Sequence, residues 1–95
     1  MKREDIKRIL KEQKAFLAEN YFVSKIGLFG SYVRNEHSEK SDIDILVEFS
    51  QPVGFEFIDL KDHLEFLFKK PVDLVNVNAL KPYMKEEILR EVQYQ

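Results

Sequence analysis

Two closely spaced aspartates are the residues of this chain best suited to chemistry. Asp42 and Asp44 are two residues apart in an apolar run, so on a β-strand both carboxylates point to one face. Two like charges held side by side raise each other's pKa, which is costly unless a cation binds between them. Because hard divalent cations prefer oxygen ligands, the pair predicts a site for Mg²⁺, with Mn²⁺ as an alternative.

An anion site is predicted upstream of these aspartates. Residues 24–29 form a short apolar segment typical of a strand, and Gly30 and Ser31 follow it. Glycine tolerates unusual backbone angles and serine is a good first residue of a helix, so a strand is expected to run into a short helix here. The free backbone N–H groups of such a helix start, with the Ser31 hydroxyl beside them, suit phosphate.

A third carboxylate is available further along the chain. Residues 71–77 are typical of another short buried strand, which Asp73 interrupts with a charge. If this strand lies beside that of Asp42 and Asp44, three carboxylates converge opposite the phosphate-binding turn. Two metal ions held there could activate a hydroxyl and stabilise the leaving oxygen of a transferred phosphoryl group. Each part alone has an ordinary structural explanation, whereas their combination favours a functional site.

This combination resembles a known signature. Gly30-Ser31, ten intervening residues and then Asp42-Ile43-Asp44 resemble the motif of the DNA polymerase β nucleotidyltransferase superfamily. The small size is similar to that of its minimal nucleotidyltransferase (MNT) branch. The resemblance implies an α/β (α+β) fold with a small mixed sheet flanked by helices. It also implies transfer of a nucleoside monophosphate from a triphosphate to an acceptor hydroxyl.

The resemblance also implies roles for individual residues. Gly30 and Ser31 would hold the triphosphate, and Arg34, which matches a basic residue after the Gly-Ser of the family, would help neutralise it. Asp42 and Asp44 would bind two Mg²⁺ ions. By the same resemblance, Asp73 would complete the catalytic metal site and help to deprotonate the acceptor hydroxyl.

The implied partner is a protein. Many MNT proteins are antitoxins encoded beside a HEPN-domain RNase toxin, so the resemblance implies a hetero-oligomer in which AMP from ATP is attached to a toxin tyrosine. A non-catalytic antitoxin that neutralises its partner by forming a complex is the alternative. A third possibility is an enzyme that modifies small molecules or RNA, as other members of the superfamily do.

Composition narrows these possibilities. The 95 residues predict one domain, 1–95, with a modest core and no room for a second substrate domain. The 15 basic and 17 acidic residues give a net charge of −2, which argues against a nucleic-acid partner. Cysteine is absent, which fits a reducing compartment. With no 18-residue apolar span either, we expect a cytoplasmic protein that does not enter membranes.

The elements that must position these residues follow from hydrophobic periodicity. Helices are predicted at 2–19, 55–69 and 80–91, and strands at 24–29, 42–47 and 71–77. Their alternation predicts a sheet covered by helices. The last helix is expected to bury Met84, Ile88, Leu89 and Val92.

Overall fold

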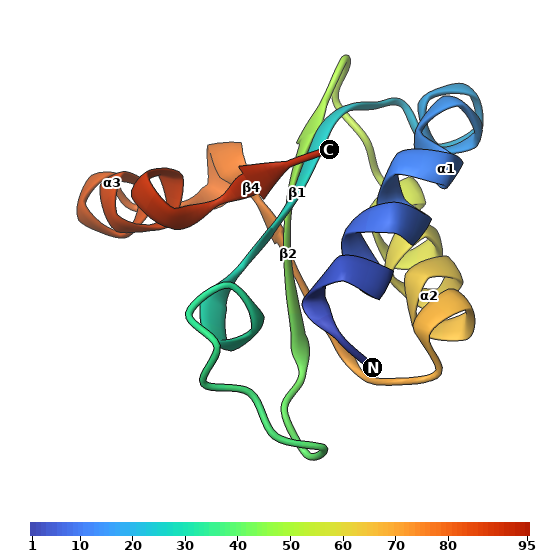
Figure 1. The fold of residues 1–95 in the computed structure, drawn as a ribbon. Helices are drawn as coiled ribbons and strands as arrows, with labels where there is room; N and C mark the ends of the chain where they lie inside the picture. The colour runs from blue at the N-terminus through green and yellow to red at the C-terminus, as the bar shows by residue number, and fades with distance from the viewer.

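The computed structural model describes residues 1–95 and contains the predicted elements in the predicted order (Figure 1). In chain order they are α1 (Arg3–Tyr21), β1 (Val23–Phe29), the 3₁₀ turn η1 (Gly30–Tyr32), β2 (Ile43–Phe49), α2 (Glu56–Phe68), β3 (Val72–Asn76), the 3₁₀ turn η2 (Val77–Ala79), α3 (Pro82–Glu91) and β4 (Gln93–Tyr94). No helix of the structure combines the length and apolar character needed to cross a membrane.

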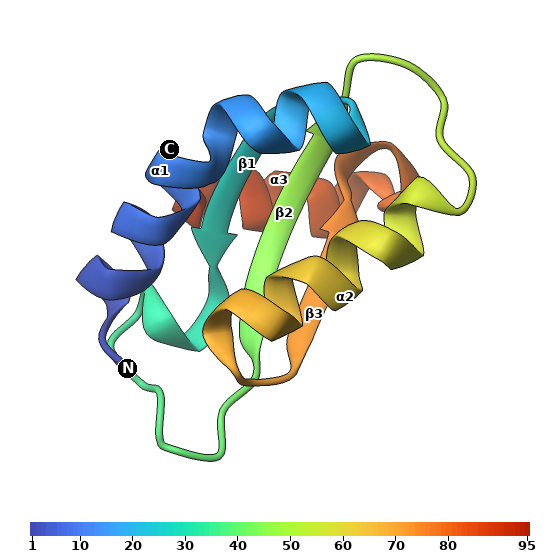
Figure 2. The ribbon, with the colours of Figure 1, turned by 90° about the vertical axis from the view of Figure 1, so that its right-hand side faces the viewer.

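The four strands form one mixed sheet in the order β3-β2-β1-β4. β1 pairs antiparallel with both β2 and β4, and β2 pairs parallel with β3. In the ribbon, α1 and α2 lie side by side over one face of the sheet, and α3 lies on the other face (Figures 1 and 2). The predicted mixed sheet flanked by helices is therefore confirmed.

The main core lies between the sheet and the pair α1 and α2. Alternation along β2 directs Ile43, Ile45 and Val47 into it, and all three are fully buried. Side chains at helical spacing close the core from the other side. They are Ile6, Leu10 and Leu17 of α1 and Leu60, Leu64 and Phe68 of α2.

The opposite face of the sheet carries a much smaller apolar cluster. Phe29, Leu46 and Val77 are buried there beneath α3, which contributes Ile88 and, just beyond its end, Val92. Ile88 and Val92, which the sequence predicts to be buried, are only half-buried. The same prediction for Met84 and Leu89 was wrong, since their exposed fractions are 40% and 41%. α3 has no fully buried residue, because a single row of its side chains meets this small cluster.

The strand β4 was not predicted, because its two residues are too few to show any periodicity. Its position depends on Gly27 of β1, which lies opposite Tyr94. A Cβ at Gly27 would lie 2.7 Å from Cγ2 of Val92 and 3.0 Å from the carbonyl oxygen of Gln93. The absence of a side chain at Gly27 therefore allows the C-terminal segment to dock against β1.

Candidate active site

Asp44 and Asp73 lie next to each other on the sheet. They are directly paired in the parallel register of β2 and β3, and Asp44 also lies opposite Phe29, the last residue of β1. Their neighbours Ile43, Ile45, Val72 and Leu74 are buried beneath α1 and α2. By alternation the two carboxylates lie on the face that carries α3.

The surroundings of Asp44 disfavour its charge. Burial raises the pKa of Asp44 to about 6, and the negative charges of Asp73 and Asp42 push it in the same direction. The backbone N–H of Ser31 lies close enough to oppose this shift in part. The charged form of Asp44 is thus disfavoured in this structure. A carboxylate that binds a cation is expected to have such surroundings, because the cation would stabilise its negative charge.

Asp42 precedes the first residue of β2 and is exposed. Its charge acts on Asp44, so it belongs to the same electrostatic environment. The three aspartates do not form a closed cluster, since nowhere in the chain do three or more His, Cys, Asp or Glu side chains gather as a ready metal cage. The residues present therefore offer a paired carboxylate site with a third carboxylate at its edge.

The turn between β1 and η1 touches this carboxylate pair. Gly30 has φ +77°, in the left-handed region that glycine adopts without strain. A Cβ at this position would lie 2.8 Å from Cγ of Asp44 and closer still to one of its carboxylate oxygens. Glycine is thus required both for the backbone angle and for the close approach of the turn to Asp44.

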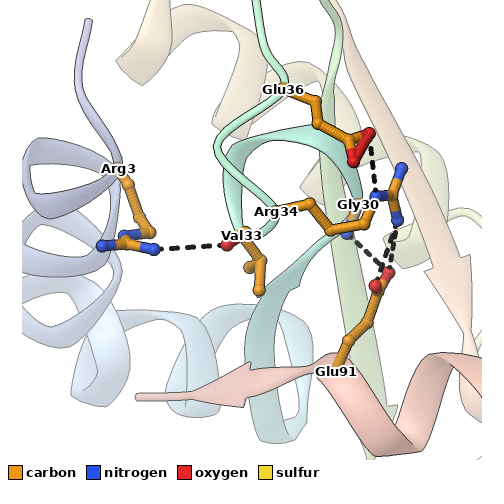
Figure 3. A network of polar contacts seen from close by, with 6 residues as sticks. All are labelled: Arg3, Gly30, Val33, Arg34, Glu36 and Glu91. Atoms are coloured by element: carbon orange, nitrogen blue, oxygen red, sulfur yellow. Dashed lines mark hydrogen bonds and ion pairs between the residues drawn. The ribbon is translucent and has the colours of Figure 1, made fainter.

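Two donors of the predicted anion site, the Gly30 N–H and Arg34, are already engaged by a carboxylate from α3 (Figure 3). Glu91 Oε1 accepts a hydrogen bond from the backbone N–H of Gly30 at 2.9 Å. Arg34 Nη1 donates to both carboxylate oxygens of Glu91 at 3.0 Å. Arg34 also pairs with Glu36 at 3.3 Å. The structure thus places Arg34 beside the Gly30 turn, in contact with side chains rather than free.

The turn is also braced from the other side. Arg3 of α1 donates a hydrogen bond to the carbonyl oxygen of Val33 at 3.2 Å (Figure 3). Tyr32 is buried in the main core, where it stacks on His37 with ring centroids 4.1 Å apart. These contacts fix the backbone whose N–H groups face the site.

A cavity of about 400 Å³ opens at this point between the turn and α3. It is within the size range of small-molecule sites. Its lining combines one cation with three carboxylates. The lining residues are Phe29, Gly30, Arg34, Asp44, Glu87, Ile88 and Glu91. Of the predicted site residues, Gly30, Arg34 and Asp44 line the cavity.

Sequence reasoning missed Glu87 and Glu91. Both lie in a charged amphipathic helix in which nothing distinguishes them from solvent-exposed acids. Only the docking of α3 and β4 brings Glu91 to Gly30, 61 residues earlier in the chain. No local signal in the sequence could have identified this contact.

Comparison with known proteins identifies the family of the chain. The family model described as a nucleotidyltransferase domain matches residues 6–95. The protein adenylyltransferase MntA of Thermococcus cleftensis is 47% identical over 92 residues, covering 96% of this chain and 93% of that protein. A solved structure described provisionally as a minimal nucleotidyltransferase has a TM-score of 0.83 and 33% identity, covering 98% of this chain and 95% of that one.

A third similarity concerns the fold alone. A solved complex described as a tri-AMPylated Shewanella oneidensis HEPN toxin with its MNT antitoxin matches with a TM-score of 0.66 and 20% identity. The match covers 93% of this chain and 70% of that one.

Proposed function

Because the chain belongs to the nucleotidyltransferase domain family, we propose that it transfers AMP from ATP to a tyrosine of a cognate HEPN toxin and acts as its antitoxin. The observation that carries this proposal is the Asp44–Asp73 pair beside the Gly30 turn. The full-length similarity to a protein named protein adenylyltransferase supports the choice of AMP and of a protein acceptor.

The carboxylates fit Mg²⁺. Asp44 and Asp73 offer adjacent oxygen ligands, and a cation bound there would offset the negative charges of Asp73 and Asp42 that, together with burial, raise the pKa of Asp44. Mg²⁺ is usually held by one or two carboxylates together with waters and substrate phosphates, so a closed protein cage is unnecessary. We propose Asp42, Asp44 and Asp73 as the residues that hold two ions. When bound, these ions supply charge neutralisation at the phosphates.

The protein residues divide the remaining work of the reaction. Gly30, Ser31 and Arg34 bind the phosphates that leave as pyrophosphate. The acceptor tyrosine oxygen forms a bond to the α-phosphorus as the bond from that phosphorus to the pyrophosphate oxygen breaks. Asp73, which is exposed, takes the hydroxyl proton as general base. In this reaction the toxin tyrosine has to approach the exposed side chain of Asp73, on the face of the sheet that carries α3.

A specific surface feature supports the alternative of a non-catalytic binding module. Ile58 and Phe66 of α2, together with Phe55 just before its first residue, fall on one side at helical spacing, with exposed fractions of 57%, 77% and 82%. Exposed large apolar side chains of this kind mark sites of protein association. This surface could bind a toxin whether or not the aspartates act on it.

Intact mass spectrometry separates the two functions. A HEPN-domain protein chosen as the candidate toxin is incubated with this chain, ATP and Mg²⁺. We expect a mass gain of one or more AMP units, mapped by peptide sequencing to a tyrosine. The variant Asp42→Asn/Asp44→Asn should lose the modification and still form the complex. Glu12→Gln/Glu19→Gln, which removes two exposed acids of α1 away from this surface, is the charge-matched control. Neutralisation of the toxin by the Asp42/Asp44 variant would contradict catalysis and favour binding alone.

A further inference from the structure

The carboxylate of Glu91 makes the contacts that a phosphate oxygen would make at the turn. It accepts from the backbone N–H of Gly30 at 2.9 Å and from Arg34 at 3.0 Å through both of its oxygens (Figure 3). A backbone N–H next to a guanidinium is a typical donor pair for phosphate. These two donors, which we call the anion seat, are filled by the protein's own side chain.

We propose that Glu91 is an intramolecular competitor of the nucleotide, so that its carboxylate must leave the anion seat before ATP phosphates can bind there. The proposal rests on the proposed function in one respect, namely that this seat receives phosphate. In this proposal Glu91 lowers the affinity of the protein for ATP. The free protein is thereby held in a closed state that ATP has to open.

Electrostatics make the competition strong. The cavity at the seat is lined by Asp44, Glu87 and Glu91, with Arg34 as the one cation. While Glu91 remains on Gly30 and Arg34, an entering triphosphate finds its donors occupied and meets a third carboxylate at close range. Like charges brought this close together repel each other, so the two anions exclude each other.

The segment that carries Glu91 is suited to release it. α3 has no fully buried residue and rests on the small cluster through Ile88, with Val92 just after it. β4, which follows, pairs with β1 over only two residues. Segments with few buried apolar contacts open at low free energy without unfolding the domain. Glu91 can therefore move away while the main core between the sheet and α1 and α2 stays intact.

A positioning role for Glu91 makes the opposite prediction. If Glu91 served to hold Arg34 and the Gly30 turn in the orientation that binds phosphate, removing its charge would weaken ATP binding. If Glu91 competes with phosphate, removing its charge strengthens ATP binding. The sign of the change in affinity therefore decides between the two roles.

The test compares Glu91→Gln with Glu87→Gln by calorimetric titration of ATP in the presence of Mg²⁺. Both variants remove one negative charge from the cavity wall, but Glu87 has no hydrogen bond to the seat. Glutamine at 91 keeps the size and an oxygen acceptor. Releasing a charge-assisted contact should lower the Kd of Glu91→Gln about fivefold to tenfold below that of Glu87→Gln. Equal Kd values, or weaker binding by Glu91→Gln, would overturn the proposal.

A measurement on the unmodified protein avoids any question of folding. The carboxyl ¹³C resonance of Glu91 reports whether its carboxylate is still bound. At saturating ATP and Mg²⁺ we expect it to move to the position of an exposed glutamate such as Glu19. A Glu91 resonance that stays unchanged while ATP binds would show that both anions share the site, and would overturn the proposal.

The two proposals fail in different experiments. Tighter ATP binding by Glu91→Gln without any modified toxin would leave the competition intact and contradict toxin AMPylation. A modified toxin together with unaltered ATP affinity in Glu91→Gln would support toxin AMPylation and overturn the competition. Absence of ATP binding by the unmodified protein and by both variants would overturn both.

Discussion

Asp44 of β2 and Asp73 of β3 occupy opposite positions in a parallel ladder, so two carboxylates lie side by side on the face of the sheet that carries α3. The buried residues on either side of each fix which way these strands face, and a shift of one residue would turn both carboxylates into the main core. The fold therefore holds two like charges together by register alone.

This arrangement makes Asp44 a destabilising group at neutral pH. Its pKa is raised to about 6, against about 3.9 for an ordinary aspartate. The folded state thus binds more protons than the unfolded state between these values, so stability falls as the pH rises through this range. Because Asp44 is only half-buried, solvent screening reduces the effect to about 1 kcal/mol.

We therefore predict that Asp44→Asn raises the free energy of unfolding by about 1 kcal/mol at pH 7.5, with a smaller gain at pH 4.5. Urea unfolding followed by circular dichroism at the two pH values measures both. Asp62→Asn, at an exposed position of α2, is the control and should show a much smaller difference between the two pH values. An Asp44→Asn protein less stable than the unmodified one at pH 7.5 would contradict the account.

Divalent cations should reverse this destabilisation. Mg²⁺ or Mn²⁺ that binds only the folded protein raises its melting temperature at pH 7.5. Below pH 6 the proton on Asp44 competes with the metal, so the rise should shrink strongly at pH 5. Thermal scans with and without millimolar Mg²⁺ test this, with Asp44→Asn/Asp73→Asn as the variant expected to lose the response. A rise of equal size at both pH values would place the cation elsewhere.

The turn at Gly30 should tolerate no side chain. Gly30→Ala adds a Cβ at φ +77° and pushes it against the Asp44 carboxylate. We expect a loss of about 1–3 kcal/mol in unfolding free energy, from backbone strain and displacement of Asp44, together with loss of ATP binding. Gly54→Ala is the matched control, since nothing lies within 4 Å of a Cβ there. Equal stability of the two variants in urea would contradict this reading of the turn.

How far the sequence predicts this molecule depends on how local each signal is. Apolar alternation around Asp44 and Asp73 gave the strands, and the isolated charges within them marked the face of the site. The sequence does not predict that β2 pairs with β3, because strand order depends on contacts between distant parts of the chain. The convergence of the carboxylates could therefore be stated only on the assumption that these two strands are neighbours. The residue types at Gly30 and Ser31 predict a short helix after β1, and the structure has a single 3₁₀ turn there.

The features that escaped prediction all involve the C-terminal segment. β4 is two residues long, and its docking depends on the missing side chain of Gly27, which within the sequence looks like any weak strand position. Met84 and Leu89 fit the helical spacing of α3 but remain exposed, because the cluster beneath the helix is small. Glu91 reaches Gly30 only as a consequence of this docking. Periodicity predicts which side of a helix or strand is apolar, but it does not predict how large an apolar surface packs against that side.

Gly27 determines whether β4 can dock against β1, although it does not belong to the candidate site. A valine there would overlap Val92 and the carbonyl oxygen of Gln93. In Gly27→Val the C-terminal segment should leave β1, so the hydrogen bond from the Gln95 N–H to the Ile26 carbonyl oxygen is lost. Hydrogen exchange at the Gln95 amide should become about as fast as in an unfolded chain, while amides of the main core keep their protection.

The same variant connects the packing of β4 with the anion seat. Glu91 is two residues before β4, so undocking this strand should also weaken its contact with Gly30 and Arg34. ATP affinity should then rise in Gly27→Val, in the same direction as in Glu91→Gln, and Gly54→Val serves as the control. If exchange at Gln95 becomes fast while ATP affinity stays unchanged, the docking of β4 does not hold Glu91 on its donors.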